Sequence, residues 1–385
     1  FPRNFTETRT LKGVEEKLPD IADLGANALW LMPVHPVSEE RRKGAEGSPY
    51  SVHDFRAVDA SLGSIDDLAA LTAAAHARGM KVLLDFVPDH SAWDHAAVKE
   101  YPNWFMKDEQ GRLRPPVPAW DDVVQFNYGN PAVRAEMQAV MYFWPSRCGI
   151  DGYRVDVAGM VPGEFWKEAI PPLRAAVTGL VMLAEATGPD YHEQGFDLSY
   201  DMDLRNRLWD VAHGKQPASA LAEHLEYVRD HYRRGALLMR YTENHDIDRT
   251  AASFAKPSDR TAAALIFSLP GVPLILAGQE VGVARRADLF VKDLVPWRDG
   301  DATLRDFYKG LIDARRKHPS LRHGSLVIRK TDQPDRVLAF TRESDEETML
   351  ALFNFSGEPA EVRVADFEAA GTVQLAPWSY VLRAL

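Results

Sequence analysis

The chain has 385 residues, with 45 Lys or Arg against 56 Asp or Glu and a formal charge of −11. This acidic balance argues against a nucleic-acid-binding protein and against a polybasic membrane-surface protein. With 45% hydrophobic residues and no apolar run long enough to span a membrane, we expect an ordinary globular protein. One cysteine, Cys148, leaves no pair for an intramolecular disulfide and no cysteine-based zinc site. Cytoplasmic location is favoured, and secretion stays open because the sequence begins at Phe1.

Short apolar runs alternate with amphipathic segments along most of the chain. The predicted strands cover residues 28–32, 81–86, 150–155, 180–184, 196–200, 237–241 and 273–277. The predicted helices cover residues 64–79, 130–148, 164–177, 220–232, 261–268 and 304–316. Ser64 with Asp67 has capping-box spacing, and Asn130-Pro131 is a typical helix start.

Strands separated by helices pair in parallel, and a full set of such units closes a (β/α)8 TIM barrel. The alternative is an open doubly wound sheet, but no Gly-rich phosphate loop follows an early strand. We therefore predict the barrel. Its first strand is expected at or before Phe1, where Phe-Pro-Arg-Asn resembles a strand end.

Two stretches depart from the alternation. The connection after residue 86 is unusually long and carries Trp93, Trp104 and Trp120, which would either rim a pocket or form a local core. We predict a short subdomain at 88–126, inserted after the third strand. The runs after residue 323 are closely spaced and strand-like, as in an antiparallel β domain. The predicted organisation is a barrel over 1–323 and a C-terminal β domain over 324–385.

Polar side chains gather just after the predicted strands. In a βα barrel the carboxyl ends of the strands share one face, so these clusters would converge there. Each cluster taken singly could be a helix cap or a surface group. The clusters are Asp89-His90, Arg154 with Asp156, Glu185, and Glu243-Asn244-His245-Asp246.

Arg154 and Asp156 are two residues apart on a strand, so both would point to one side. The guanidinium would lower the pKa of Asp156 and keep it ionised, as a nucleophile requires. A structural ion pair is the alternative. Glu185 follows an apolar run, and a carboxyl near other carboxylates has a raised pKa and can donate a proton. Two carboxyl groups with separated pKa values are what cleavage of a glycosidic bond requires.

Six short motifs together resemble the α-amylase family of glycoside hydrolases (glycoside hydrolase family 13). Four are like the family's ordered signature regions and two like auxiliary regions, and the resemblance covers residues 1 to about 320. The signature-like motifs are Asp85-Phe-Val-Pro-Asp-His90, Gly152-Tyr-Arg-Val-Asp156, Ala184-Glu185 and Asn244-His-Asp246. The auxiliary motifs lie at residues 25–33 and 271–280.

The resemblance implies roles for individual residues. Asp156 matches the nucleophile, Glu185 the general acid/base, and Asp246 the third carboxylate, which engages sugar hydroxyls in the transition state. The substrate-binding residues it implies are Tyr50, His90, Arg154, His245 and Arg249. Arg154 would orient the nucleophile, and Tyr50 would stack on the reacting glucose unless it belongs to the core.

Several positions depart from the family pattern. Asp89 stands where the family usually has Asn, and Gly159 and Met160 stand where many amylases carry Lys and His. The Asn and the His are calcium-linked positions, and the Lys-His pair touches leaving-group sugars. We therefore expect no cofactor and no calcium. A different interpretation makes Asp89, His90, Asp94 and His95 metal ligands, although their spacing matches no zinc pattern.

The leading hypothesis is a retaining hydrolase that cleaves α-glucosidic bonds of α-glucans or malto-oligosaccharides through a covalent glucosyl–Asp intermediate. A glucosyl- or maltosyltransferase on the same scaffold is the first alternative. A metal-dependent barrel hydrolase and a non-catalytic sugar-binding protein are the others. The expected partner is an oligosaccharide, with no nucleic acid and no membrane; oligomeric state is not readable from the sequence. Short oligosaccharides are expected to be preferred over raw starch.

Overall fold

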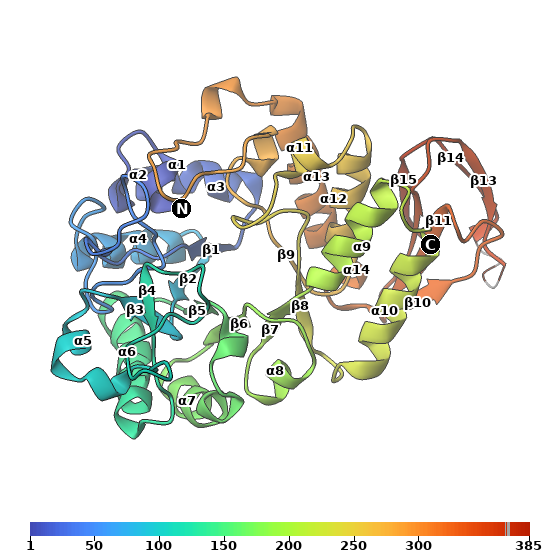
Figure 1. Cartoon of the computed structure of the whole chain (residues 1–385). Helices are drawn as coiled ribbons and strands as arrows, with labels where there is room; N and C mark the ends of the chain where they lie inside the picture. Colours follow the sequence, from blue (N-terminus) through green and yellow to red (C-terminus); the bar gives the residue numbers. More distant parts are fainter. Residues whose placement is uncertain (366, 368–369) are drawn as a thin grey trace. The chain divides into compact units, whose positions relative to one another are not determined.

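A computed structural model describes residues 1–365, 367 and 370–385 (Figure 1). The chain forms two compact units. The first consists of Phe1–Ser199 and Ala287–Val295, and the second of Tyr200–Arg286 and Pro296–Leu385. Within these described residues, no helix is both long and apolar enough to cross a membrane.

The first unit is built on parallel strands. In order across the sheet they are β1 (Ala28–Leu31), β2 (Lys81–Phe86), β5 (Gly152–Val155), β6 (Val181–Ala184) and β7 (Leu198–Tyr200), which pairs with β6 through Leu198 and Ser199. All residues of β5 are buried, which fits a parallel sheet covered on both faces.

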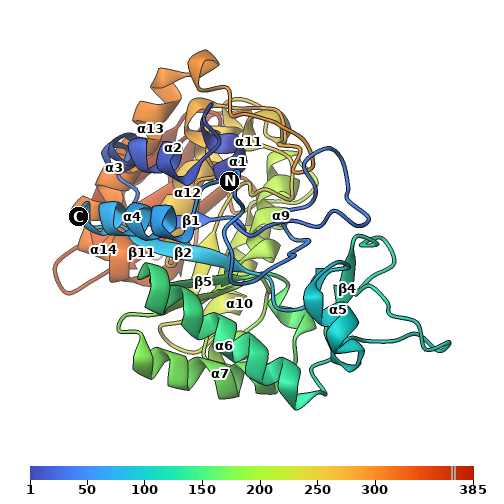
Figure 2. The same ribbon diagram turned by 90° about the vertical axis from the view of Figure 1, so that its left-hand side faces the viewer.

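Helices connect and cover these strands. They are α1 (Pro2–Phe5), α2 (Leu11–Glu16), α3 (Leu18–Leu24), α4 (Ile65–His76), α6 (Pro131–Cys148), α7 (Gly163–Ala176) and α8 (Asp190–Glu193), with the 3-10 turn η2 (Ala158–Met160). Figure 2 shows α6 and α7 side by side below β5. The capping box of α4 is present as predicted, because the Ser64 side chain accepts from Asp67 N and the Asp67 carboxylate accepts from Ser64 N.

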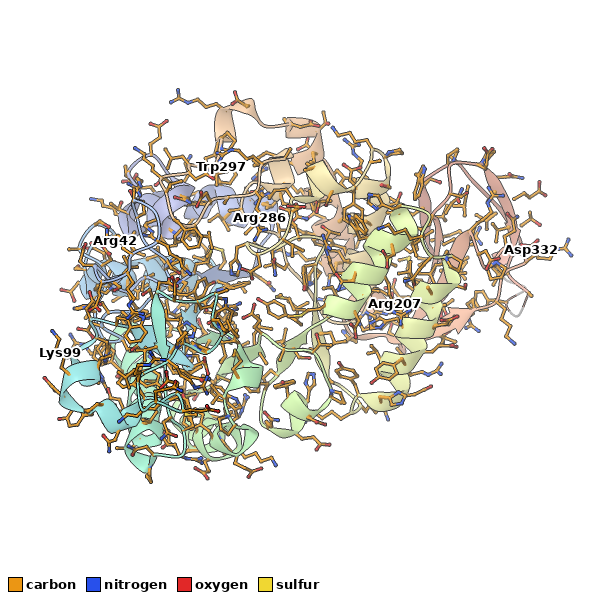
Figure 3. All side chains as sticks on the ribbon, in the orientation of Figure 1. Arg42, Lys99, Arg207, Arg286, Trp297 and Asp332 are labelled. Carbon is orange, nitrogen blue, oxygen red and sulfur yellow. The ribbon has the colours of Figure 1, made fainter. Side chains whose placement is uncertain are left out.

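The stretch between β2 and α6 contains a small antiparallel pair, β3 (His90–Ala92) with β4 (Val123–Gln125). It also contains α5 (Ala96–Glu100) and the 3-10 turn η1 (Pro102–Trp104). The exposed Lys99 marks the outer side of α5 (Figure 3). This is the stretch that we predicted as an inserted subdomain.

The second unit contains the parallel pair β8 (Leu237–Arg240) and β9 (Val272–Pro273). Its helices are α9 (Met202–Ala212), α10 (Ser219–His231), α11 (Thr250–Ser253), α12 (Ser258–Ser268), α13 (Ala302–Lys317) and α14 (Pro319–His323), with η3 (Gln279–Val281) and η4 (Trp297–Asp299). An antiparallel sheet follows, β10 (Ser325–Arg329), β11 (Val337–Glu343), β12 (Thr348–Asn354) and β15 (Tyr380–Ala384). The hairpin β13 (Ala360–Arg363) and β14 (Thr372–Leu375) completes the predicted β region.

Some sequence predictions were wrong in detail. Phe1-Pro-Arg-Asn does not end a strand, because residues Pro2–Phe5 form a helical turn. The helix Met202–Ala212 was not predicted, and the strand expected at 273–277 is reduced to Val272–Pro273. The domain boundaries at 88–126 and 323/324 stay predictions.

Candidate active site

The register of the parallel strands brings the signature motifs of the first unit together. Asp85 on β2 lies beside Arg154 on β5, and Val155 lies beside Ala184 on β6. The ladder continues one residue further, since Asp156 N donates to Phe86 O over 2.8 Å and Glu185 N to Val155 O over 3.0 Å. Asp156 and Glu185 therefore leave adjacent strands at the same edge of the sheet.

The fully buried Arg154 holds three carboxylates at this edge. Its Nη1 donates to Asp85 Oδ1 over 2.8 Å and to Asp156 Oδ1 over 2.9 Å. Its Nη2 forms an ion pair with Glu185 Oε1 at 2.6 Å. The planar guanidinium thus fixes the two candidate catalytic carboxyls on its two terminal nitrogens.

The charge balance of this cluster differs from our expectation. Burial raises the pKa of Asp156 well above its usual value; Arg154 acts to lower it, while Glu185 and Asp85 raise it. The predicted net lowering of the Asp156 pKa was therefore wrong, because one guanidinium does not offset burial and two neighbouring carboxylates. Burial likewise raises the pKa of Asp85 to about 7, against the opposing effect of Arg154.

Two aromatic residues complete the surroundings of Asp85. Its Oδ2 accepts from Trp30 Nε1 at 3.2 Å and from the Tyr50 hydroxyl at 3.3 Å. The Arg154 guanidinium carbon lies 5.1 Å from the Trp30 ring centroid and 5.8 Å from that of Tyr50. Tyr50 is half-buried beside the cluster, as a stacking residue would be. Trp30 was missed because its sequence context predicts an ordinary buried strand.

Glu185 is also held by a strained backbone. Its Oε2 accepts from Val157 N at 2.8 Å. Val157 has φ 39° and ψ 46°, a left-handed conformation that is costly for a β-branched residue. Such outliers persist where the surrounding structure holds them and concentrate at functional sites.

His90 is buried next to Asp89 in the inserted stretch. His90 Nδ1 is 3.4 Å from Asp89 Oδ2, and Asp89 Oδ1 accepts from Gln125 Nε2 at 3.1 Å. The Trp120 ring lies 5.8 Å from the His90 ring. Trp93 is largely buried under the Arg41 guanidinium, and Trp104 stacks on Tyr101.

Asp94 and His95, the other two residues of the metal-site hypothesis, each have partners away from Asp89 and His90. Asp94 accepts from Ser38 Oγ at 2.8 Å and pairs with His53 Nδ1 at 3.1 Å, whereas His95 caps its own helix by accepting from Ala97 N. Across residues 1–365, 367 and 370–385, no group of three or more His, Cys, Asp or Glu side chains is arranged to hold a metal ion.

In the second unit, the motif after β8 positions the third carboxylate. Asp246 N donates to Asn244 Oδ1 over 2.9 Å, and Asp246 Oδ2 lies 3.3 Å from Nε2 of the buried His245. The Asp246 side chain is 47% exposed, so its carboxylate is open to solvent and to a ligand.

Arg249 anchors the segment that follows β8. It is buried, pairs with Glu243 Oε1 at 2.9 Å, and donates to Ala277 O and Val283 O over 3.0 and 3.3 Å. Burial raises the pKa of Glu243, which also accepts from Thr250 N. The resemblance did not identify Glu243 as an anchor, although its place beside Asn244 was a usable signal.

Comparison with known proteins gives a consistent result. Residues 1–303 match the family model of the alpha amylase catalytic domain, and residues 328–379 match that of the maltogenic amylase C-terminal domain. The chain is 29% identical to alpha-amylase MalA of Haloarcula japonica, over 91% of this chain and 53% of that protein. It is 28% identical to an alpha-1,4-glucan:maltose-1-phosphate maltosyltransferase of Myxococcus xanthus, over 93% of this chain and 58% of that protein.

The chain therefore spans little more than half the length of these two relatives. Among solved structures, the maltogenic alpha-amylase AmyB of Thermotoga neapolitana superposes with a TM-score of 0.90 at 30% identity, covering 100% of this chain and 94% of AmyB. This similarity confirms the predicted fold class, a (β/α)8 barrel followed by a small antiparallel β domain.

Proposed function

Because the chain belongs to the alpha-amylase family, we propose that it is a retaining glycoside hydrolase acting on α-glucosidic bonds of α-glucans or malto-oligosaccharides. One observation carries the proposal. A single buried guanidinium, that of Arg154, contacts both Asp156 and Glu185 at the ends of adjacent parallel strands. A nucleophile and a proton donor held side by side are what a double-displacement mechanism needs.

In the first step, the Asp156 carboxylate attacks the anomeric carbon while Glu185 protonates the departing glycosidic oxygen. In the second, Glu185 removes a proton from water, which attacks the same carbon and releases Asp156. Burial raises the pKa values of Asp85 and Asp156, and the Arg154 guanidinium opposes this effect by favouring the ionised form of Asp156 that attacks the sugar. For Asp246, in the second unit, the family resemblance implies the role of the third carboxylate, which engages sugar hydroxyls.

The test is a pair of isosteric variants. Asp156→Asn and Glu185→Gln should each reduce turnover of malto-oligosaccharides by several orders of magnitude, since each removes several kcal/mol of barrier lowering. Glu164→Gln, a change at an exposed carboxylate on α7, is the matched control and should leave turnover unchanged. The assignment fails if either site variant, correctly folded, keeps more than about a tenth of the wild-type rate.

The stereochemistry gives a second readout of the same proposal. A covalent glucosyl–Asp156 intermediate requires two displacements and therefore retention of the α configuration. Proton NMR of the first-formed product distinguishes the anomers, and an initial β product would contradict the mechanism.

We further propose that the activity needs no metal or other cofactor. Asp89 contacts Gln125 and His90, and the Met160 side chain offers no nitrogen or oxygen ligand at the second calcium-linked position. The separate partners of Asp94 and His95 also disfavour the metal-dependent hydrolase. A non-catalytic sugar-binding role is disfavoured because Asp156, Glu185 and Asp246 are all retained.

Glycosyl transfer is the second candidate, and the similarity to the Myxococcus maltosyltransferase favours it. Hydrolysis and transfer share the glucosyl–Asp156 intermediate and differ in whether water or a sugar hydroxyl intercepts it. Analysis of products from maltose, maltotriose and soluble starch separates the two, because transfer yields products longer than the substrate.

A further inference from the structure

The turn that follows Asp156 lacks a side chain where the resemblance led us to expect a sugar-binding lysine. Gly159 occupies that position in η2, is exposed, and has an ordinary backbone conformation that any residue could adopt. A side chain at this position would meet a neighbouring side chain rather than the backbone. A methyl group on Gly159 would lie 2.7 Å from the hydroxyl oxygen of Tyr191, which is too close for contact.

Tyr191 comes from α8, in the loop that follows Glu185 and β6. Its half-buried ring packs edge-on against Phe196, with centroids 6.3 Å apart at 72°. Burial raises the pKa of Tyr191, so the hydroxyl remains a hydrogen-bond donor at neutral pH. Among the residues that the structure describes, no protein group hydrogen-bonds to this hydroxyl. A half-buried ring whose hydroxyl has no protein partner among the described residues is suited to bind a polar ligand.

The position of this hydroxyl relative to Glu185 indicates which sugar it would meet. Val157 N donates to Glu185 Oε2, and Gly159 is two residues further on, a span of at most about 7 Å. Glu185, as the proposed acid, must face the oxygen of the leaving group. The Tyr191 hydroxyl beside Gly159 is therefore close to the backbone that holds Glu185, and a sugar of the leaving group is the part of the substrate that it could reach.

We propose that Tyr191 is a specificity-determining residue that binds leaving-group sugars. Its hydroxyl would hydrogen-bond to a hydroxyl of the first or second glucose beyond the cleaved bond, where Gly159 offers no side chain that could do so. The inference rests on the proposed function. Since the acceptor of a transfer reaction uses the same side, Tyr191 would also affect the partition between hydrolysis and transfer.

The test compares two substrates that differ on the leaving-group side. Maltotriose places sugar there, whereas α-maltosyl fluoride releases only fluoride. Tyr191→Phe should lower kcat/KM for maltotriose by about 2- to 12-fold, the value of one neutral hydrogen bond, and mainly through KM. It should leave kcat/KM for α-maltosyl fluoride within about twofold of wild type. Tyr227→Phe, at an exposed tyrosine on α10, is the matched control and should change neither.

Gly159→Ala probes the same contact from the other side. The new methyl group should displace the Tyr191 hydroxyl and reproduce the selective loss on maltotriose. On the Tyr191→Phe background the nearest ring carbon lies 3.8 Å from that methyl group, so Gly159→Ala should add little. In a double-mutant cycle, a loss of kcat/KM for the double variant that is smaller than the combined losses of the two single variants indicates a direct contact between the two positions.

Selective loss on maltotriose in both variants, with non-additivity, supports the inference. Equal losses on both substrates, or no loss on maltotriose, overturn it while leaving the proposed function intact. Failure of the wild-type protein to cleave either substrate overturns the proposed function and the inference with it.

Discussion

Replacing Arg154 by Lys tests whether one guanidinium organises the site. Arg154 contacts Asp156 with one terminal nitrogen and Glu185 with the other, at 2.9 and 2.6 Å. A lysine keeps the charge but has a single nitrogen, so it cannot reproduce both contacts. Loss of one charge-assisted hydrogen bond costs about 1.5–3 kcal/mol, which corresponds to a roughly 10- to 150-fold lower kcat/KM.

The pH profile makes the prediction specific. Burial raises the pKa of Asp156, and Arg154 opposes this effect. A lysine would oppose it less effectively, so the pKa should rise further and the acid limb of kcat/KM should move to higher pH. The assay is kcat/KM for maltotriose across pH, with circular dichroism to verify folding.

Arg342→Lys is the matched control, because Arg342 is also fully buried but donates to Ser268 O and Gly324 O instead of carboxylates. That variant should lose stability without moving the acid limb. The reasoning is refuted if Arg154→Lys leaves the acid limb in place, or if Arg342→Lys moves it equally.

Three further outcomes are expected. Burial raises the pKa of Asp85 to about 7, so between about pH 4 and 7 the native state holds a proton that the unfolded state has lost. The free energy of unfolding should therefore fall over this range as pH rises, by up to about 1.4 kcal/mol per pH unit. Asp85→Asn should flatten this slope when urea unfolding is measured across pH. EDTA should leave both the rate and the melting temperature unchanged, whereas a large loss restored by calcium would contradict metal independence. Catalytic efficiency should level off between maltotriose and maltopentaose, because the inserted stretch is short and position 159 lacks a side chain; efficiency that rises to a maximum on soluble starch would contradict this.

Local signals in the sequence predicted much of the barrel frame. The strand Lys81–Phe86 and the capped helix after Ser64 have the predicted positions, because apolar runs and capping residues act over a few neighbouring positions. The helix Met202–Ala212 escaped prediction, because charged residues interrupt its apolar periodicity. Its Asp201 cap, which accepts from Leu204 N, was the usable signal.

The grouping of Asp156 and Glu185 around Arg154 was predictable from the sequence, whereas the pKa shift of Asp156 was not. The positions of Asp156 and Glu185 at predicted strand ends predicted that they lie close together. In the structure, β5 and β6 are adjacent parallel strands, and the two residues directly follow them. The sign of the Asp156 pKa shift depends on burial and on two neighbouring carboxylates, Glu185 and Asp85. The spacing of Arg154 and Asp156 in the sequence shows neither the burial of Asp156 nor the carboxylates around it. Reasoning from the spacing alone therefore predicted the wrong direction for the pKa shift of Asp156.

The left-handed Val157 links the chemistry to the proposed sugar contact. Its backbone turns the chain sharply after Asp156, so that Val157 N points at Glu185 while Gly159 comes to the surface beside Tyr191. A β-branched residue in this conformation costs on the order of 1–3 kcal/mol relative to an unstrained backbone. A glycine would relieve that strain but would also loosen the N–H that holds Glu185. The left-handed backbone of Val157 therefore has two structural consequences. It holds the carboxylate of Glu185, the proposed proton donor, and it sets the position of Gly159 beside Tyr191.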